Sequence, residues 1–259
     1  MGTVTKALTL LTYFNRSRNV IGLSEMSRLS GVNKATVHRM LGELQQQGFV
    51  EQVGSSREYR LGPALLRLAS LREASVPTRE IAMQILRNLS DLVHETTHFS
   101  LLHGDVLSTT AFAYSQAHGT RVTMEDASVL TLHSTSSGLA VLAYSDKTYV
   151  NHTLAKNLAQ HTHKTITDPD VLKAMLAPIR AKGFSEIQGG FEADVHSFGA
   201  PIFDSSQRCI GAIAIAAPIT RVSQELRETI ARELPKAAAE LTRLIGGFPP
   251  DDFPIGANT

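Results

Sequence analysis

The amino-acid sequence predicts an α+β protein built from two domains, a small N-terminal one and a larger C-terminal one. At 259 residues the chain is long enough for two domains of ordinary size. Short helical patterns and one hairpin fill the first part, and longer helical patterns with apolar β-runs fill the rest. Residues 1–72 carry ten basic and four acidic residues, against 15 basic and 20 acidic ones in the remainder. A basic head of net charge +6 therefore precedes an acidic body of net charge −5.

The N-terminal segment, residues 1–62, has the element order of a winged helix-turn-helix. After an opening helix, Ser24 is expected to cap a short second helix. Gly31 supplies the tight bend that follows, because glycine tolerates a positive φ. Asn33 is expected to cap a third helix, which ends before Gly48. A helix, a short helix, a sharp turn and another helix thus follow each other closely, as this motif requires.

The third predicted helix has an apolar back and a front of small, polar and basic residues. Such a front suits the major groove of DNA, although any amphipathic surface helix has a similar back. The context favours DNA, because two short strands follow around the polar turn at 54–56 and form a hairpin with Arg57 and Arg60 beside it. Basic residues at both places would attract backbone phosphates. The head is therefore predicted to bind DNA.

A linker helix is expected over residues 63–78, and the second domain over 79–248. Gly104-Asp105 is a strong signal for a hairpin. Helices that flank a mostly antiparallel sheet predict an α+β sensor domain. The tail, residues 249–259, is rich in proline and is predicted to be disordered. The remaining elements expected in the second domain are helices near 79–93, 136–145, 147–159, 170–182 and 222–245, and two strands within 195–217.

Composition excludes several classes of protein. No stretch approaches the ~18 continuous apolar residues that a membrane helix needs, and the N-terminus lacks the basic leader and cleavage site of a signal peptide. Cys209 is the single cysteine, which excludes an internal disulfide and fits the cytoplasm. Neither a Walker sequence nor a Rossmann fingerprint occurs, so no cofactor is expected.

One short motif points to a different function. His94-Glu95-Thr96-Thr97-His98 matches the zinc-binding pattern H-E-x-x-H, which requires both histidines on one helix. The helical pattern ends near Val93, and the chain alternates as a strand from His98. We therefore expect neither a metal site nor catalysis here, and keep a zinc-dependent metalloenzyme as the alternative function.

Longer segments resemble the IclR-type transcriptional regulators over about residues 3–245. The resemblance rests on LSEMSRLSGVNKATVHRMLGELQQQGFVE and YRLGPALLRLA in the head, and on TLHSTSSGLAVLA and VHSFGAPIFDSSQRCIGAIAIAAP in the second domain. It implies a GAF-like C-terminal domain that binds a small-molecule effector, and no catalysis. It further implies a homodimer or dimer of dimers on palindromic double-stranded DNA operators. An effector-independent architectural DNA binder is a second alternative.

The resemblance also implies two sets of site residues. Arg39 is the best candidate for a base or phosphate contact, because a guanidinium can make either. A helix that begins near Ser136 could hold a carboxylate at its N-terminus. The implied DNA-binding residues are Lys34, Ala35, Thr36, His38, Arg39 and Arg57. The implied effector-binding residues are His133, Ser134, Thr135, Ser136, Ser137, Ile187, His196, Ser197, Phe198, Ala214 and Ala216.

Four of these positions depart from the family pattern. Members that bind very small polar acids have an acidic residue, a cysteine and two serines, where this sequence has Ile187, Ser197, Ala214 and Ala216. Lost polar groups leave a small hydrated acid few partners. The sequence therefore predicts a larger, partly apolar effector such as an aromatic acid, unless these side chains only pack the sheet. Phe99, Phe112 and Tyr114 are expected to add apolar surface.

Overall fold

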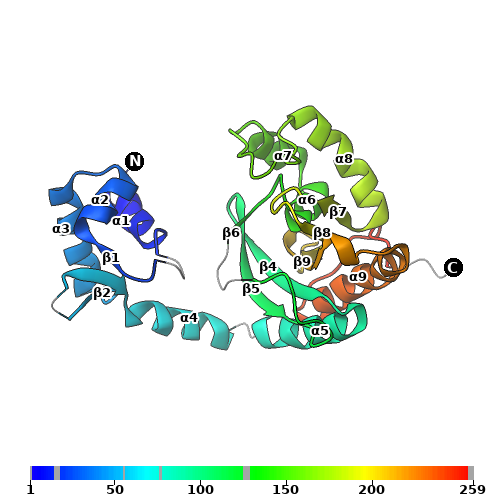
Figure 1. Cartoon of the computed structure of the whole chain (residues 1–259), viewed down its shortest axis with the longest axis horizontal. Coiled ribbons are helices and arrows are strands. Elements are labelled where there is room, and N and C mark those ends of the chain that lie inside the picture. The colour runs from blue at the N-terminus through cyan, green and yellow to red at the C-terminus, as the bar shows by residue number, and fades with distance from the viewer. Residues whose placement is uncertain (1, 15–17, 55, 76–77, 125–128, 256–259) are drawn as a thin grey trace. The chain divides into compact units, whose positions relative to one another are not determined.

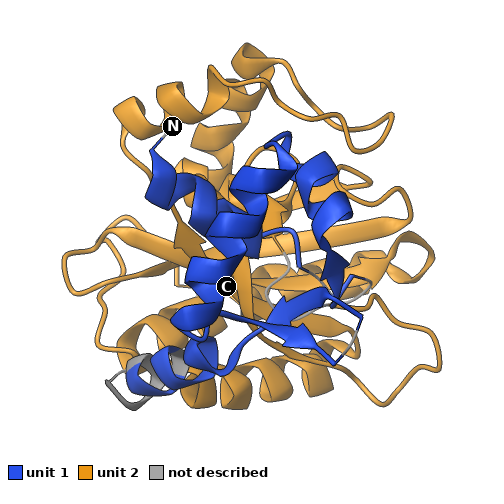
Figure 2. Ribbon diagram, turned by 90° about the vertical axis from the view of Figure 1, so that its left-hand side faces the viewer, with its two compact units in different colours: residues 1–77 blue, residues 78–259 orange. Residues whose placement is uncertain are grey.

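The chain divides into two compact units, residues 1–77 and 78–259 (Figure 2). The first unit includes the predicted linker except for its last residue, Thr78, at which the second unit begins, one residue before the predicted start of the C-terminal domain. Residues described by the computed structural model are 2–14, 18–54, 56–75, 78–124 and 129–255.

Unit 1 combines four helices with a three-stranded antiparallel sheet of order β1-β3-β2 in its described residues (Figure 1). Its core includes Leu10, Ile21, Met26, Val37 and Leu41, each at most 1% exposed. Burial of each such side chain contributes about 1.5–3 kcal/mol. The elements are α1 (Thr3–Leu11), β1 (Ile21–Gly22), α2 (Leu23–Ser30), α3 (Lys34–Gln46), β2 (Val50–Val53), β3 (Glu58–Leu61) and α4 (Pro63–Ser75).

The turn between α2 and α3 forms as the sequence predicts. Gly31 adopts φ +66°, a left-handed conformation that is costly for other residues. The Asn33 side chain then accepts a hydrogen bond from the Thr36 N–H at 2.9 Å, which confirms Asn33 as the cap of α3. The predicted Ser24 cap is wrong, because α2 begins at Leu23 and its N-cap position is Gly22.

Unit 2 has a six-stranded antiparallel sheet of order β6-β5-β4-β9-β8-β7 in its described residues, with helices on both faces (Figure 1). This confirms the α+β class. None of the described helices is long and apolar enough to cross a membrane. The elements are α5 (Thr78–Val93), β4 (Thr96–His103), β5 (Val106–Ala113), β6 (Val129–Thr131), α6 (Ser136–Ala143), α7 (Lys147–Leu154), α8 (Pro169–Lys182), β7 (Ser185–Gln188), β8 (Val195–Phe203), β9 (Cys209–Pro218), the 3-10 turn η1 (Ile219–Arg221) and α9 (Gln224–Leu244).

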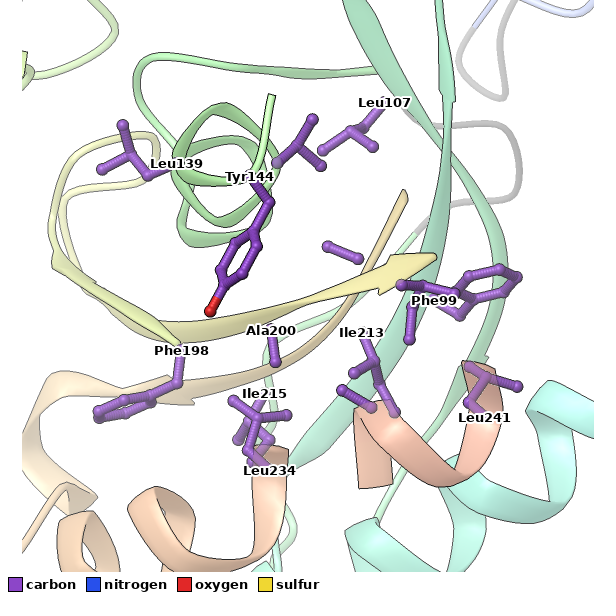
Figure 3. Packing of buried hydrophobic residues seen from close by; sticks show 14 of the residues in the cluster. Phe99, Leu107, Leu139, Tyr144, Phe198, Ala200, Ile213, Ile215, Leu234 and Leu241 are labelled. Carbon is purple, nitrogen blue, oxygen red and sulfur yellow. The ribbon is translucent and has the colours of Figure 1, made fainter. Parts of the chain in front are cut away.

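Each face of this sheet packs against its own helices. On one face, Ile213 and Ile215 of β9 lie near Leu234 and Leu241 of α9, and Leu139 of α6 lies on the opposite side (Figure 3). We call the first the α9 face and the second the α6 face. Helix α5 also packs on the α9 face, beside α9. Because side chains alternate along a strand, the pairing register assigns each strand residue to one of the two faces.

Several short elements differ from the predictions. Strands β1, β6 and β7 were not predicted, and α7 ends at Leu154 although the pattern predicts a helix to residue 159. These strands are two to four residues long and lie at sheet edges. A segment so short carries little periodic signal, and it becomes a strand through its pairing partner.

The prediction of a disordered tail is wrong for residues 249–255, which pack onto unit 2. Phe253 is 5% exposed, and its ring meets those of Tyr144 and Phe203 edge-on, with centroids 5.7 and 5.6 Å apart. Arg180 forms a bidentate ion pair with Asp252 at 2.7 and 3.1 Å. A proline-rich composition predicted disorder, but one buried aromatic ring anchors the segment. The rest of the predicted tail, 256–259, lies outside the described residues.

Candidate functional site

Helix α3 presents one polar face to solvent. Its buried residues Val37, Met40, Leu41 and Leu44 recur at helical spacing and pack into the core of unit 1. This packing leaves the other face of α3 exposed. Lys34, Ala35, His38 and Arg39 are exposed on α3, and Thr36 is half-buried beside the Asn33 cap.

Arg39 can bind a phosphate or a base because its present ion pair is weak. Its Nη1 lies 3.5 Å from Oε1 of Glu43, one helical turn away, and both side chains are about 60% exposed. Exposed pairs of this kind contribute at most about 1 kcal/mol. The guanidinium could therefore exchange Glu43 for a phosphate or a guanine edge.

The hairpin of β2 and β3 holds two arginines differently. Arg57 is exposed in the turn and adopts φ +57°, which is uncommon outside glycine. Arg60 lies opposite Glu51 in the strand register, and its Nε is 2.6 Å from Oε1 of that residue. Arg57 is thus the arginine that the hairpin presents at its tip.

In unit 2 the N-terminus of α6 is built closely against its surroundings. The Thr135 hydroxyl accepts from the Gly138 N–H at 3.0 Å and donates to the Thr131 carbonyl at 2.8 Å. Gly199 of β8 makes the close approach possible, because a Cβ there would lie 2.6 Å from the Ser136 carbonyl carbon. Ser136 and Ser137 are each 1% exposed. The first turn of α6 therefore lies directly over the sheet.

The four positions that depart from the family pattern lie together beneath this turn. Ser137 Oγ contacts His98 of β4 at 3.3 Å, which places His98 on the α6 face. In the register, Ala214 is the neighbour of His98 on β9. Ala216, Ser197 and Ile187 form a second row across β9, β8 and β7 on this face. Three of the four side chains are apolar, and Ser197 is the polar exception.

Two other predicted effector residues lie on the face opposite to the α6 turn. Strand alternation places His196 and Phe198 on the α9 face, and their rings stack with centroids 4.8 Å apart. His196 Nε2 lies 2.8 Å from Oε1 of Glu186, which also pairs with Arg227 of α9. The predicted effector site groups His196 and Phe198 with the first turn of α6, but the register places both on the opposite face of the sheet from that turn. Both stand one residue from Ser197, and a step of one residue reverses the face.

Phe99, which the sequence suggests as apolar surface for the effector, also lies on the face opposite to the α6 turn. It is fully buried and lies on the α9 face, because it alternates with His98 along β4. Phe112, the neighbour of His98 on β5, does lie on the α6 face. Its ring contacts that of Tyr114, with centroids 5.2 Å apart.

His133 and Ser134 are held by the structure around the α6 turn. His133 Nε2 donates to the Ala159 carbonyl at 2.8 Å, and Ser134 Oγ hydrogen-bonds to Thr131 Oγ1. The ring of His161 lies next to His133, with centroids 5.9 Å apart. Both predicted residues are buried near the first turn of α6, and their polar partners are the last residue of β6 and the loop residue Ala159.

His98 was missed as an effector-binding candidate. It is 5% exposed, and burial lowers the pKa of its ring to about 4. Its Nδ1 has no hydrogen-bond partner among the described residues. In the sequence, His98 stands out only as part of the zinc motif. Its contact with Ser137 could not be predicted, because 39 residues separate the two in the chain.

The H-E-x-x-H residues do not form a zinc-binding helix. Helix α5 ends at Val93, His94 adopts φ +57°, and β4 begins at Thr96. Glu95 is 2% exposed and forms a bidentate ion pair with Arg221. In the described part of the chain, no three His, Cys, Asp or Glu side chains gather closely enough to hold a metal ion.

Comparison with known proteins gives the same organisation. Residues 3–54 match the family model for the IclR helix-turn-helix domain, and residues 73–243 match the one for the C-terminal domain of the bacterial transcriptional regulator IclR. The transcriptional repressor IclR of Escherichia coli K12 is 31% identical over 254 residues, which cover 95% of this chain and 90% of the repressor.

Solved structures agree over nearly the whole chain. A protein from Silicibacter sp. TM1040, assigned to the IclR transcriptional regulators, is 52% identical and has a TM-score of 0.91, covering 98% of this chain and 100% of its own. An IclR homologue from Microbacterium hydrocarbonoxydans, solved in complex with 4-hydroxybenzoate, is 24% identical, with a TM-score of 0.76 and coverage of 94% and 99%. With its helix-turn-helix unit and its α+β second unit, this chain belongs to the IclR family of bacterial transcriptional regulators.

Proposed function

We propose that this regulator changes its affinity for a DNA operator when it binds a carboxylic acid with an aromatic or otherwise apolar body. The acid would bind on the α6 face of unit 2, beneath the first turn of α6. In such a regulator the effector shifts operator affinity through a coupling of about 1–3 kcal/mol. The protein would act in the cytoplasm and without catalysis.

The observation that carries this proposal is the composition of the α6 face. Ile187, Ala214 and Ala216 lie on it together, with Ser197 as the polar member of the group. A very small acid keeps its hydration shell unless the protein replaces those hydrogen bonds. Apolar side chains instead favour a ligand that brings apolar area of its own.

A relative supports the same class of ligand. The Microbacterium hydrocarbonoxydans homologue was solved with 4-hydroxybenzoate, an aromatic acid. That ligand belongs to that protein, and for this chain it makes benzoates the first compounds to test. Phe112 on the α6 face is an aromatic side chain on which such a ring could pack.

For unit 1 we propose that α3 enters the major groove. Lys34, Ala35, Thr36, His38 and Arg39 would lie along the groove, and Arg57 at the hairpin tip would meet the backbone. The operator would be palindromic and bound by a homodimer or a dimer of dimers, because paired half-sites mirror a twofold axis.

Fluorescence anisotropy with DNA from upstream of the protein's own gene tests regulation. We expect tight binding that withstands scrambled competitor DNA and weakens steeply with salt. Benzoate or 4-hydroxybenzoate should change the operator affinity about 5- to 150-fold. Equal affinity for operator and scrambled DNA, with no effect of any acid, would instead indicate an architectural DNA binder.

A thermal-shift screen tests the ligand class separately. Benzoate and 4-hydroxybenzoate should raise the melting temperature, because a ligand that binds only the folded state stabilises it. Pyruvate and glyoxylate serve as the small hydrated acids. Stabilisation by these two and not by the benzoates would contradict the aromatic class and leave the regulator itself intact.

A further inference from the structure

His98 combines burial with an unsatisfied ring nitrogen. The side chain is 5% exposed, and its Nδ1 has no hydrogen-bond partner among the described residues. Buried polar groups of folded proteins are nearly always paired, and each exception calls for an explanation. An unpaired nitrogen in an apolar setting costs free energy that a bound partner would recover.

The other polar residues of β4 on the same face, Thr96 and Ser100, both have hydrogen-bond partners. Thr96 donates from its hydroxyl to the Val122 carbonyl at 2.7 Å. The Ser100 and Thr109 hydroxyls are 3.4 Å apart and pair with each other. Along the described residues of β4, His98 is therefore the polar side chain on the α6 face that has a ring nitrogen without a partner.

One tautomer of the His98 ring can offer this bond as a donor while keeping the contact with Ser137. Burial lowers the pKa of His98 to about 4, so the ring is neutral at pH 7 and carries one N–H. Its Nε2 lies 3.3 Å from the Ser137 hydroxyl. When that hydroxyl donates, Nε2 accepts and the proton resides on Nδ1. The unsatisfied nitrogen is then a hydrogen-bond donor.

A donor at this position faces an environment that favours an anion. Ser137 belongs to the first turn of α6, where the helix has its positive end. The cap residue Thr135 accepts from the N–H groups of Gly138 and Leu139, the third and fourth of the helix. The N–H groups of Ser136 and Ser137 have no such partner among the described residues and add two donors at the same helix end.

The neighbours of His98 suit the remainder of an aromatic acid. Its cross-strand partners are Phe112 on one side and Ala214 on the other, and directly opposed side chains lie on one face. Ala216 and Ile187 continue this apolar surface. Hydrogen-bond donors gathered at one end of an apolar surface suit a ligand with a single charged end.

On the basis of the proposed function, we propose that His98 binds the carboxylate of the effector through Nδ1–H, while Ser137 orients the ring through Nε2. His98 is thus a specificity-determining residue of the effector site. It selects an acid over a neutral molecule of the same shape, since an amide in place of the carboxylate offers a weaker acceptor.

Calorimetric titration of the full chain with benzoate and with benzamide, its neutral analogue, tests this role. Wild type should prefer benzoate at least tenfold. His98→Leu should lose that preference, with benzoate affinity reduced at least tenfold. His98→Asn should keep benzoate affinity within about threefold, because its amide places an N–H near the position of Nδ1. His103→Leu, an exposed histidine at the end of the same strand, is the matched control and should equal wild type.

The outcomes separate this inference from the proposed function. Benzoate binding that His98→Leu leaves unchanged would overturn the role of His98 alone. Equal losses in His98→Leu and His98→Asn, with both variants folded by circular dichroism, would overturn it too, since the ring and not its donor would then matter. If wild type binds pyruvate and no benzoate, the aromatic class fails, and the same variants with pyruvate and pyruvamide decide the role of His98. Failure of every acid to bind wild type overturns both proposals.

Discussion

Arg221 and Glu95 form a bidentate ion pair, with both N–O distances 2.6 Å, although 126 residues separate them in the chain. Glu95 is 2% exposed, and the same arginine also donates to the Thr120 carbonyl at 3.1 Å. One guanidinium thus joins the turn after α5, the segment that follows β5 and the 3-10 turn before α9. Glu95, the glutamate of the H-E-x-x-H motif, therefore links these three segments of unit 2 through its ion pair with Arg221.

Replacing Arg221 with alanine should destabilise unit 2, because it leaves the Glu95 carboxylate buried and unpaired. We expect a loss of about 3 kcal/mol in the free energy of unfolding, measured by urea denaturation. Lys173→Ala removes an exposed pair with Asp170, 3.8 Å apart, and should cost less than about 1 kcal/mol. Equal stabilities of the two variants would contradict a structural role for the buried pair.

Arg39→Ala should weaken operator binding about 5- to 150-fold, the equivalent of about 1–3 kcal/mol for a lost base contact. If Arg39 meets only a phosphate, the loss should be uniform across DNA sequences and should lower the salt slope by about 1. Anisotropy titrations at several salt concentrations distinguish the two cases. Arg243→Ala, an exposed arginine on α9, serves as the control and should bind as wild type does.

Gly199→Ala should destabilise unit 2 because α6 leaves no room for a side chain. A Cβ there would lie 2.6 Å from the carbonyl carbon and 2.7 Å from the carbonyl oxygen of Ser136, and backbone atoms cannot rotate away. The expected cost is about 1–3 kcal/mol or more, from thermal or urea unfolding. Gly119→Ala has no atom within 4 Å of the new Cβ and should be close to neutral.

His98 should make the stability of unit 2 depend on pH between about 4 and 6.5. Burial lowers its pKa in the folded state to about 4 from 6.5, so the unfolded state binds more protons in this range. The stability contribution is complete above pH 6.5 and is lost as the pH falls, by about 3 kcal/mol at pH 4. Urea denaturation at several pH values should show a smaller acid loss for His98→Asn. An unchanged pH profile would argue against a depressed pKa.

Phe253→Ala should show that the C-terminal segment is part of the fold. The ring is 5% exposed against Tyr144 and Phe203, and removing it should cost about 3–5 kcal/mol if the cavity does not collapse. Limited proteolysis should then release the tail more quickly. Ile255→Ala, at a position 52% exposed, is the control and should behave as wild type.

The sequence by itself determined the features that depend on neighbouring residues. The period of Val37, Met40, Leu41 and Leu44 predicted both the helix α3 and its exposed polar face. The bend at Gly31 and the cap at Asn33 followed from the conformational and hydrogen-bonding preferences of single residues. The longer segments that resemble IclR-type regulators carried the family assignment, since they extend over both units.

Tertiary structure alone decided what depends on distant parts of the chain. Ser197 lies on the α6 face while His196 and Phe198 lie on the α9 face, because the pairing register sets the direction of each side chain. A buried aromatic ring holds residues 249–255 despite their proline-rich composition. His98 meets Ser137 only because β4 and α6 pack together. Local patterns record the propensities of a segment, whereas burial and pairing depend on partners that its own sequence does not contain.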